Sequence, residues 1–361
     1  MLREVAQRGT SIQQEQATRA LQITALLRDE RMAVAETGGR PAAAHTAATQ
    51  GKNRQVYTAD QGSTLPGRLV RREGEPAVGD AATDEAYTGA GDTYDLYLNA
   101  YSRHSIDDHD MQLNSTVHYQ KGYDNAFWNG SQMVYGDGDE DLPPDQQLFN
   151  RFTIALDVIG HELTHGVTQF TANLNYFNQS GALNESISDV FGSLVKQNKL
   201  NQAAAQADWI IGEGLFTSNV HGQGIRSMKA PGTAYDDPVL GKDPQPAHMK
   251  DYNNTLEDNG GVHINSGIPN HAFYVTAVEI GGNAWDKAGR IWYATLKDKL
   301  QPGSDFQSAA LLTYQAAGEL FGEGSLEQKA VRTGWAEVGI SVEASPNPNP
   351  GCLPSLAKLI M

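Results

Sequence analysis

The spacing of hydrophobic residues changes near Pro144, and this change limits the folds that the chain can adopt. Between about residues 56 and 135, short runs such as 94–98, 115–119 and 132–135 are separated by Gly, Asp and Asn, which is typical of strands and turns. Beyond Pro144, longer segments have apolar residues at helical spacing. They predict helices over residues 149–170, 182–196, 271–280, 285–300 and 306–321. This order predicts an α+β fold with a β-rich lobe at residues 54–170 and a mainly α-helical lobe at 171–341.

A separate segment, residues 1–53, precedes the two lobes. Residues 11–34 are predicted to form one amphipathic helix, because Ser11 and Gln14 resemble a capping box. The apolar stripe of this helix consists of Ile12, Ala20, Ile23 and Leu27. The residues that follow, up to 53, are rich in Ala, Gly and Thr and indicate a linker. The segment is either a flexible decoration or a removable pro-segment, and residues 342–361 are expected to form a flexible tail.

Composition restricts the function only broadly. Of 361 residues, 39% are hydrophobic and 19% are charged, as in globular proteins. The 27 Lys and Arg against 43 Asp and Glu give a net charge of −16, which disfavours binding to the phosphate backbone of nucleic acids. No apolar run approaches the roughly 20 residues of a membrane helix, and the single Cys352 cannot form an internal disulfide. We expect no nucleic-acid or membrane partner, and a monomer.

The strongest motif is H-E-x-x-H at residues 161–165, inside a predicted helix. His161 and His165 are four residues apart, so their β-carbons lie about 5–6 Å apart on one helical face. Two nitrogens in this arrangement can bind one zinc ion. Glu162 projects to the flank, where it can activate a metal-bound water without binding the metal. The alternative is an ordinary helix with two histidines bonded to neighbouring groups.

A second predicted helix, opening within residues 180–189, supplies a third ligand. Glu185 and Asp189 are four residues apart and share a face. Glu185 completes a set of two His and one Glu that leaves a coordination position open for water, which is typical of catalytic zinc. Asp189 is placed to accept the distal N–H of a ligating histidine. Both carboxylates could also serve as favourable charges in the first turns of a helix.

These residues belong to a longer resemblance. The run HELTHGVTQFTANLNYFNQSGALNESISD resembles the thermolysin-like neutral metallopeptidases, as do YDNAFWNGSQMVYGDGD, EDNGGVHINSGIPNHAFY and the short IRSM. The resemblance covers roughly residues 56–340, and the short N-terminal segment is similar to that of the protealysin branch. It implies a two-lobed fold with the active-site cleft between the lobes. It also implies a zinc endopeptidase, made as a zymogen that its own pro-segment inhibits.

The resemblance implies roles for individual residues in catalysis. Zinc would be bound by His161, His165 and Glu185, with Glu162 as the general base. Tyr176 and His263 would stabilise the oxyanion of the tetrahedral intermediate, and Asp258 would orient His263.

The resemblance also implies how peptide and protein substrates bind. Asn125 and the carbonyl of Ala126 would hold the substrate backbone and the leaving amine, and Arg226 would bind the peptide carbonyl beyond the cut. The pocket for the residue after the scissile bond would consist of Phe149, Phe152, Val158 and Ile225. Such a pocket implies cleavage on the amino side of Leu, Phe, Ile or Val.

Family members usually bind calcium as well, but the pattern of calcium ligands is altered here. Asp157, Asp208 and Glu213 match acidic calcium ligands beside the active-site helix, whereas Lys196 and Ile210 replace two further acidic positions. A lysine ammonium could take the place of one cation by pairing with the remaining carboxylates. One catalytic zinc is expected, and calcium stays an open alternative.

Two other functions fit the zinc motif. The first is a peptide-binding protein that keeps the fold without turnover, which the joint presence of Glu162, Tyr176 and His263 disfavours. The second is a zinc aminopeptidase, which would need an acidic anchor for a free amine that no motif provides. Because the family is largely secreted, we expect an extracellular protein. A cytoplasmic location is the alternative, since MLREVAQRGT lacks the apolar core of a signal peptide.

Overall fold

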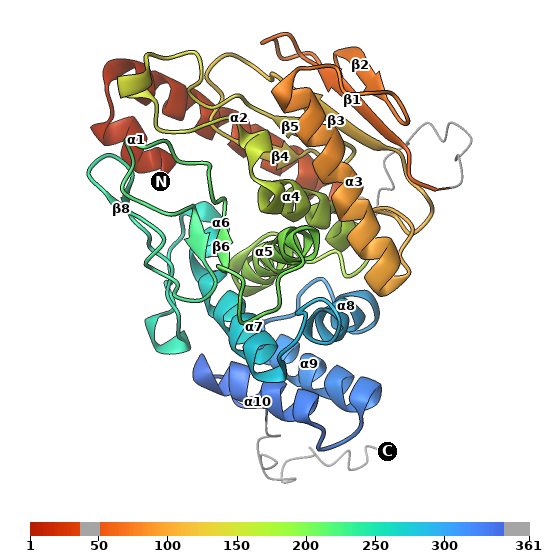
Figure 1. Ribbon diagram of the computed structural model, residues 1–361. Helices are drawn as coiled ribbons and strands as arrows, with labels where there is room; N and C mark the ends of the chain where they lie inside the picture. Colours follow the sequence, from red (N-terminus) through yellow and green to blue (C-terminus); the bar gives the residue numbers. More distant parts are fainter. Residues whose placement is uncertain (37–50, 343–361) are drawn as a thin grey trace, which may run out of the picture.

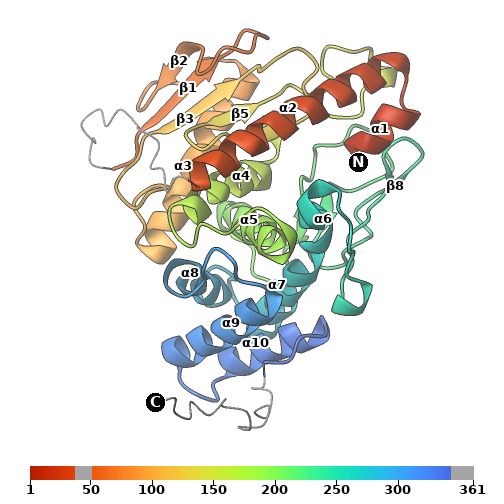
Figure 2. The same cartoon turned by 180° about the vertical axis from the view of Figure 1, so that it is seen from behind.

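Two lobes meet at a pair of neighbouring helices, α4 (Leu156–Gln169) and α5 (Asn178–Leu200), as Figure 1 shows. The computed structural model describes residues 1–36 and 51–342, without the side chains of residues 27–36. The N-terminal lobe contains the main sheet, and the C-terminal lobe contains the later helices (Figures 1 and 2). The predicted α+β, two-lobed organisation is confirmed. The predicted linker and tail fall largely on residues 37–50 and 343–361, outside the described part.

The N-terminal lobe is built on a five-stranded mixed sheet with the strand order β2-β1-β3-β5-β4. The strands are β1 (Arg54–Thr58), β2 (Arg68–Arg72), β3 (Leu113–Val117), β4 (Ala126–Trp128) and β5 (Met133–Tyr135). The inner pairs β1–β3 and β3–β5 are parallel, and the outer pairs β1–β2 and β4–β5 are antiparallel. Buried strand residues such as Val56, Leu113 and Met133 share one core with α3 and α4.

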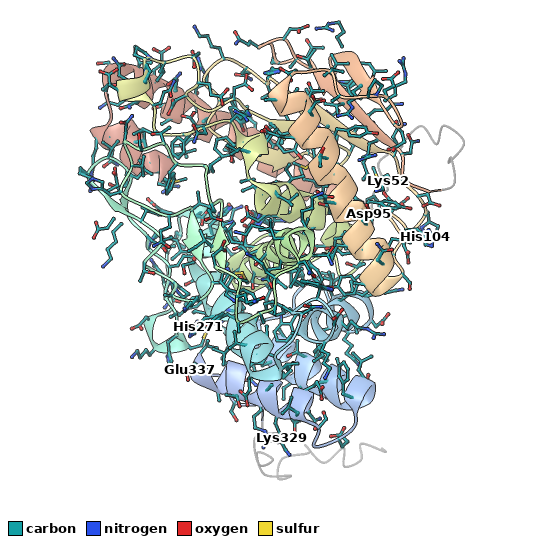
Figure 3. All side chains as sticks on the ribbon, in the orientation of Figure 1. Lys52, Asp95, His104, His271, Lys329 and Glu337 are labelled. Carbon is teal, nitrogen blue, oxygen red and sulfur yellow. The ribbon has the colours of Figure 1, made fainter. Side chains whose placement is uncertain are left out.

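The prediction of a strand at residues 94–98 is wrong. These residues lie in α3 (Ala81–Tyr101), which begins where the Asp80 carboxylate accepts a hydrogen bond from the Thr83 N–H at 2.8 Å. Tyr97 is buried against α5, with its ring 5.4 Å from that of Phe191. Asp95 faces outward and pairs with Lys52 at 2.5 Å (Figure 3). A run of five residues is too short to distinguish the strand period of about 2 residues from the helical period of about 3.6 residues. Packing of Tyr97 against α5 favours the helix.

The C-terminal lobe consists of helices joined by loops and short ladders. The remaining helices are α6 (Asp258–Asn265), α7 (Gly267–Ile280), α8 (Ala288–Asp298), α9 (Phe306–Phe321) and α10 (Leu326–Glu337). The ladders pair β6 (Ile210–Ile211) with β7 (Arg226–Ser227) and β8 (Asp236–Asp237) with β9 (Gly241–Lys242). The helices predicted at 182–196, 271–280, 285–300 and 306–321 are confirmed. The helix predicted at 149–170 begins only at Leu156, because Phe149 forms a β-bridge with Phe216.

Two helices precede the lobes, α1 (Leu2–Arg8) and α2 (Ser11–Glu36), and the sequence pattern indicates only the second. The capping box at its start is one residue earlier than predicted. The Thr10 N–H donates to Gln13 Oε1 at 2.7 Å, and the Gln13 N–H donates to Thr10 Oγ1 at 3.4 Å. None of the described helices is long and apolar enough to cross a membrane.

The buried face of α2 agrees with the prediction in part. Ala20 is fully buried and Ile23 packs against the core as predicted, whereas Ile12 is 49% exposed and Ala17 is fully buried. Gln13 and Gln16 are buried beside the two alanines, and Gln13 Nε2 donates to the carbonyl oxygen of Gln146 at 2.7 Å. The small side chains allow α2 to lie close to the lobe beneath it. Because buried glutamines share this contact, the sequence of α2 does not show a continuous apolar stripe.

Candidate active site

Close packing of α4 against α5 brings the motif residues together. A β-carbon on Gly192 of α5 would lie 2.3 Å from the carbonyl oxygen of Asp157 on α4. On the facing side, a β-carbon on Gly160 would lie 3.0 Å from the Gly192 Cα. Larger residues at either position would push the helices apart. Glycine at this crossing therefore places the histidines of α4 next to Glu185 of α5.

His161, His165 and Glu185 form a buried group whose candidate ligand atoms all lie within 4.8 Å of one another. The Nε2 atoms of His161 and His165 lie 3.5 and 3.4 Å from the two carboxylate oxygens of Glu185. Within the described residues, the buried Oε2 of Glu185 has no hydrogen-bond partner. Two imidazole nitrogens and a buried carboxylate with free acceptor capacity fit zinc.

The other ring nitrogens of the two histidines are held by α5. His161 Nδ1 lies 2.8 Å from Asp189 Oδ1, the contact that the spacing predicts. His165 Nδ1 lies 2.8 Å from Asn184 Oδ1 and 3.0 Å from Ser188 Oγ, two residues that sequence reasoning missed. Their i,i+4 spacing next to Glu185 and Asp189 is the signal that could have found them. These contacts turn both Nε2 atoms toward the metal position.

Asp189 also holds Arg226. The guanidinium donates to both carboxylate oxygens at 2.7 and 2.6 Å, and Asn270 Nδ2 donates to Oδ2 at 2.8 Å. Burial opposes ionisation of Asp189, but the charges of Arg226 and His161 outweigh burial and lower its pKa to about 2. One ionised carboxylate thus orients a candidate zinc ligand and a candidate substrate-binding residue.

Glu162, the predicted general base, is held by the sheet. Its Oε2 accepts a hydrogen bond from the backbone N–H of Trp128, at the end of β4, at 3.0 Å. The indole N–H of Trp128 donates to Gln169 Oε1 of α4 at 3.0 Å. Sequence reasoning missed this role of Trp128, although the residue lies in the run YDNAFWNG. The contact fixes the carboxylate at the flank of the motif helix.

The predicted oxyanion-stabilising residues, Tyr176 and His263, lie next to Glu185. The Tyr176 hydroxyl donates to Glu185 Oε1 and lies 3.2 Å from His263 Nε2. Asp258 holds His263 twice, through Nδ1 at 2.7 Å and through the backbone N–H at 2.9 Å. Asp258 and Asn259 both have a φ of 53°, in the left-handed region that non-glycine residues rarely adopt. Such backbone strain is concentrated at functional sites.

The predicted substrate-binding residues line one cavity of about 530 Å³, with one exception. The residues that line it together with His161, Glu162 and His263 are Asn125, Ala126, Phe152, Val158, Ile225 and Arg226. Phe149 is not among them. It is buried behind Phe152, with the ring centroids 6.2 Å apart, so it supports the pocket wall from outside the cavity.

The same cavity is closed on one side by the N-terminal segment, through Met1, Leu2, Arg3, Leu21, Thr24 and Ala25. Thr24 also lines the adjoining cavity of about 80 Å³ around the candidate zinc ligands His161, His165 and Glu185. Its Oγ1 accepts a hydrogen bond from Asn125 Nδ2 at 3.0 Å. The run of α2 across the sheet-bearing lobe is visible in Figure 2. The segment therefore lies over the cleft.

The three candidate calcium ligands surround a lysine. Lys196 Nζ lies 3.0 Å from Asp157, 2.9 Å from Asp208 and 3.7 Å from Glu213. It also donates to the carbonyl oxygen of Ile210 at 2.8 Å. Burial lowers the pKa of Lys196, but Asp157 and Asp208 outweigh burial and raise it above its ordinary value. The structure thus favours the lysine alternative over a calcium ion at these carboxylates.

Comparison with known proteins gives matches along most of the chain. Residues 8–169 match the thermolysin metallopeptidase catalytic domain, and residues 172–340 match the thermolysin metallopeptidase alpha-helical domain. An extracellular metalloprotease of Pectobacterium carotovorum subsp. carotovorum is 55% identical over 80% of this chain and 82% of its own length. Protease PrtS of Photorhabdus sp. (strain Az29) is 54% identical over 81% of this chain and 77% of its own length. The solved precursor of protealysin, a metalloproteinase from Serratia proteamaculans, has a TM-score of 0.83 and 49% identity, covering 94% of this chain and 97% of that one.

Proposed function

The chain belongs to the thermolysin family and is a zinc metalloendopeptidase, and from this premise we propose that it is a zymogen that cleaves before large hydrophobic residues. The observation that carries the proposal is the cavity of about 530 Å³, which joins His161 and Glu162 to the apolar wall and is closed on one side by the N-terminal segment. Relatives named as extracellular support secretion of the enzyme, and we propose that it acts as a monomer.

In this proposal, the protein groups divide the chemistry of peptide hydrolysis. His161, His165 and Glu185 would hold a zinc ion, which would supply a Lewis acid for the scissile carbonyl and lower the pKa of a bound water. Glu162 takes a proton from the attacking water and transfers it to the leaving amine. The Trp128 N–H keeps this carboxylate in position between the two steps.

Developing negative charge on the carbonyl oxygen requires preorganised donors. Tyr176 and His263, which lie 3.2 Å apart beside Glu185, are expected to supply these donors, and Asp258 holds the ring of His263. Arg226, held by Asp189, is expected to bind the substrate carbonyl beyond the cut. Asn125 and the Ala126 carbonyl are expected to bind the substrate backbone.

Specificity follows from the wall of the cavity. Phe152, Val158 and Ile225 present apolar side chains next to Glu162, so a hydrophobic residue directly after the scissile bond would be removed from water there. Burying a Leu or Phe side chain contributes about 1.5–3 kcal/mol. We therefore expect cleavage on the amino side of Leu, Phe, Ile or Val.

Inhibition follows from the position of α2. Thr24 accepts a hydrogen bond from the amide of Asn125, and the first three residues line one side of the cavity, so the segment occupies part of the path by which a peptide would approach Glu162. Cleavage between about residues 36 and 54 would free the segment to leave.

The test is hydrolysis of a blocked peptide containing Gly-Leu by the intact chain and by the chain without residues 1–53. We expect cleavage before Leu only by the shortened chain, lost with a chelator and restored by zinc. Zinc bound in stoichiometric amount without cleavage would disprove the catalytic proposal. Equal activity of the intact chain would disprove the zymogen.

A further inference from the structure

Asp124, in the wall of the cleft, is a buried carboxylate with free hydrogen-bonding capacity. It lines the 530 Å³ cavity and is only 4% exposed. Its Oδ1 has no hydrogen-bond partner anywhere in the described ranges 1–36 and 51–342. An unpaired buried carboxylate costs stability, so its retention calls for another explanation.

Arg19 of α2 covers the turn that carries Asp124. Its Nη2 donates to the carbonyl oxygen of Lys121 at 2.5 Å and to that of Gly122 at 3.4 Å. Its Nε has no hydrogen-bond partner within the described part of the chain. The turn at residues 121–124 therefore offers two carbonyl oxygens and a carboxylate to a cation, and the N-terminal segment supplies that cation.

Most of the other charged side chains that line the cavity are acidic, like Asp124. Its carboxylates are Asp124, Glu162, Asp243, Glu257 and Asp258, and its cation from the two lobes is Arg226. Arg226 is bound to Asp189, and Asp258 is bound to His263. The carboxylate of Asp243 accepts backbone N–H groups from Gly232, Ala234 and Gln245.

Among the described residues of the lobes, no such partner is found for Asp124 and Glu257, and the N-terminal segment places an arginine near each. Arg3 pairs with Glu257, and Arg19 lies on the turn of Asp124. Burial, followed by the nearby Asp139 and Asp141, raises the pKa of Asp124 well above its ordinary value, and Arg19 opposes this shift only in part. A cation in this part of the cleft therefore favours the ionised carboxylate.

We propose that Asp124 is a specificity residue that selects substrates with a basic side chain on the leaving-amine side of the scissile bond. This inference rests on the proposed function. Asp124 directly precedes Asn125, the residue proposed to hold the substrate backbone near the leaving amine. Once α2 has left, a lysine or arginine of the substrate takes the place of Arg19 and binds the Asp124 carboxylate with the carbonyl oxygens of Lys121 and Gly122.

The test uses two series of blocked peptides with a Gly-Leu bond and the chain without residues 1–53. One series carries Ala, Lys or Glu at the second residue after the bond, and the other carries them at the second residue before it. In the first series we expect kcat/KM for the Lys peptide to exceed that for the Glu peptide roughly ten- to hundredfold, as a hydrogen bond to a charged group predicts. Asp124→Asn should bring this ratio close to one.

Glu140→Gln is the control, because Glu140 pairs with Arg151 at 2.9 Å and does not line the cavity. It should keep the Lys-to-Glu ratio of the unmodified enzyme, and Asp124→Asn should not change the second series. A ratio near one in the unmodified enzyme would overturn the inference, even if Asp124→Asn does not fold. An equal loss of the ratio in Glu140→Gln would also overturn it. Failure to cut the Ala peptides would instead disprove the proposed function.

Discussion

The same two helices carry a buried cluster at each end, and the two clusters neutralise their carboxylates in different ways. At one end, His161 and His165 of α4 face Glu185 of α5, and the ligand atoms of all three converge within 4.8 Å. At the other end, Asp157 of α4 faces Lys196 of α5 at 3.0 Å. The first cluster fits an added zinc ion, whereas the chain supplies its own cation to the second.

The difference shows how one helix pair separates catalysis from stability. A bound metal ion brings Lewis acidity and an open coordination position, which a lysine ammonium cannot provide. A lysine is covalently attached, so it neutralises the buried Asp157 without depending on the concentration of any ion. We therefore expect changes at the zinc cluster to affect activity first, and changes at the Lys196 cluster to affect stability first.

The largest effect is expected for Glu162→Gln, which keeps the shape of the side chain and removes the base. We expect kcat to fall about 10²–10⁴-fold, the usual contribution of general acid–base catalysis. Zinc content and melting temperature should stay close to those of the unmodified chain. Assays of the chain without residues 1–53, with zinc measured in the same samples, check this. Loss of zinc together with activity would place Glu162 among the ligands.

The next effect is expected for Lys196→Met, which leaves Asp157 buried without its cation. Removing one partner of a buried ion pair costs about 3–5 kcal/mol of unfolding free energy. Chemical denaturation measures it, and Lys199→Met is the control, because Lys199 pairs with Asp92 at the surface. Similar stabilities of the two variants would mean that the Lys196 cluster contributes little.

Lys196→Glu should convert the second cluster into one that depends on an added ion. With Asp157, Asp208 and Glu213, it would offer four carboxylates, the ligand type that calcium prefers. At a calcium concentration 100 times the dissociation constant, binding would add about 2.7 kcal/mol. Melting temperatures with and without calcium test this, and the unmodified chain should show a smaller shift. No calcium response of Lys196→Glu would contradict the interpretation of this cluster as an altered calcium site.

The smallest effect is expected for Asn184→Ala, which removes the partner of His165 Nδ1 and leaves the three ligands in place. Loss of such an outer contact lowers metal affinity about 10–100-fold. Titration with a competing chelator measures the affinity. Asn219→Ala, at a surface amide remote from the zinc cluster, is the control. Unchanged zinc affinity would mean that Ser188 alone orients the ring.

The sequence by itself determined the features that depend on local spacing. Residues four apart on a helix must share a face, so the pairs His161–His165 and Glu185–Asp189 could be placed before the fold was known. The order of strand-like and helix-like segments likewise predicted the two lobes. Lys196 could be identified as a substitute cation because it stands at an expected acidic position.

Only the tertiary structure decided the features that depend on contacts between distant segments. Residues 94–98 form a helix because Tyr97 packs against α5, and the local alternation gives no sign of this. The Trp128 N–H on Glu162 and Arg19 on the turn of Asp124 join segments 34 and about 100 residues apart. The exposure of Ile12 on α2 was misjudged for the same reason, since small and amide side chains occupy the buried positions against the lobe beneath. Spacing along the chain specifies which face a residue occupies, but only packing specifies what that face meets.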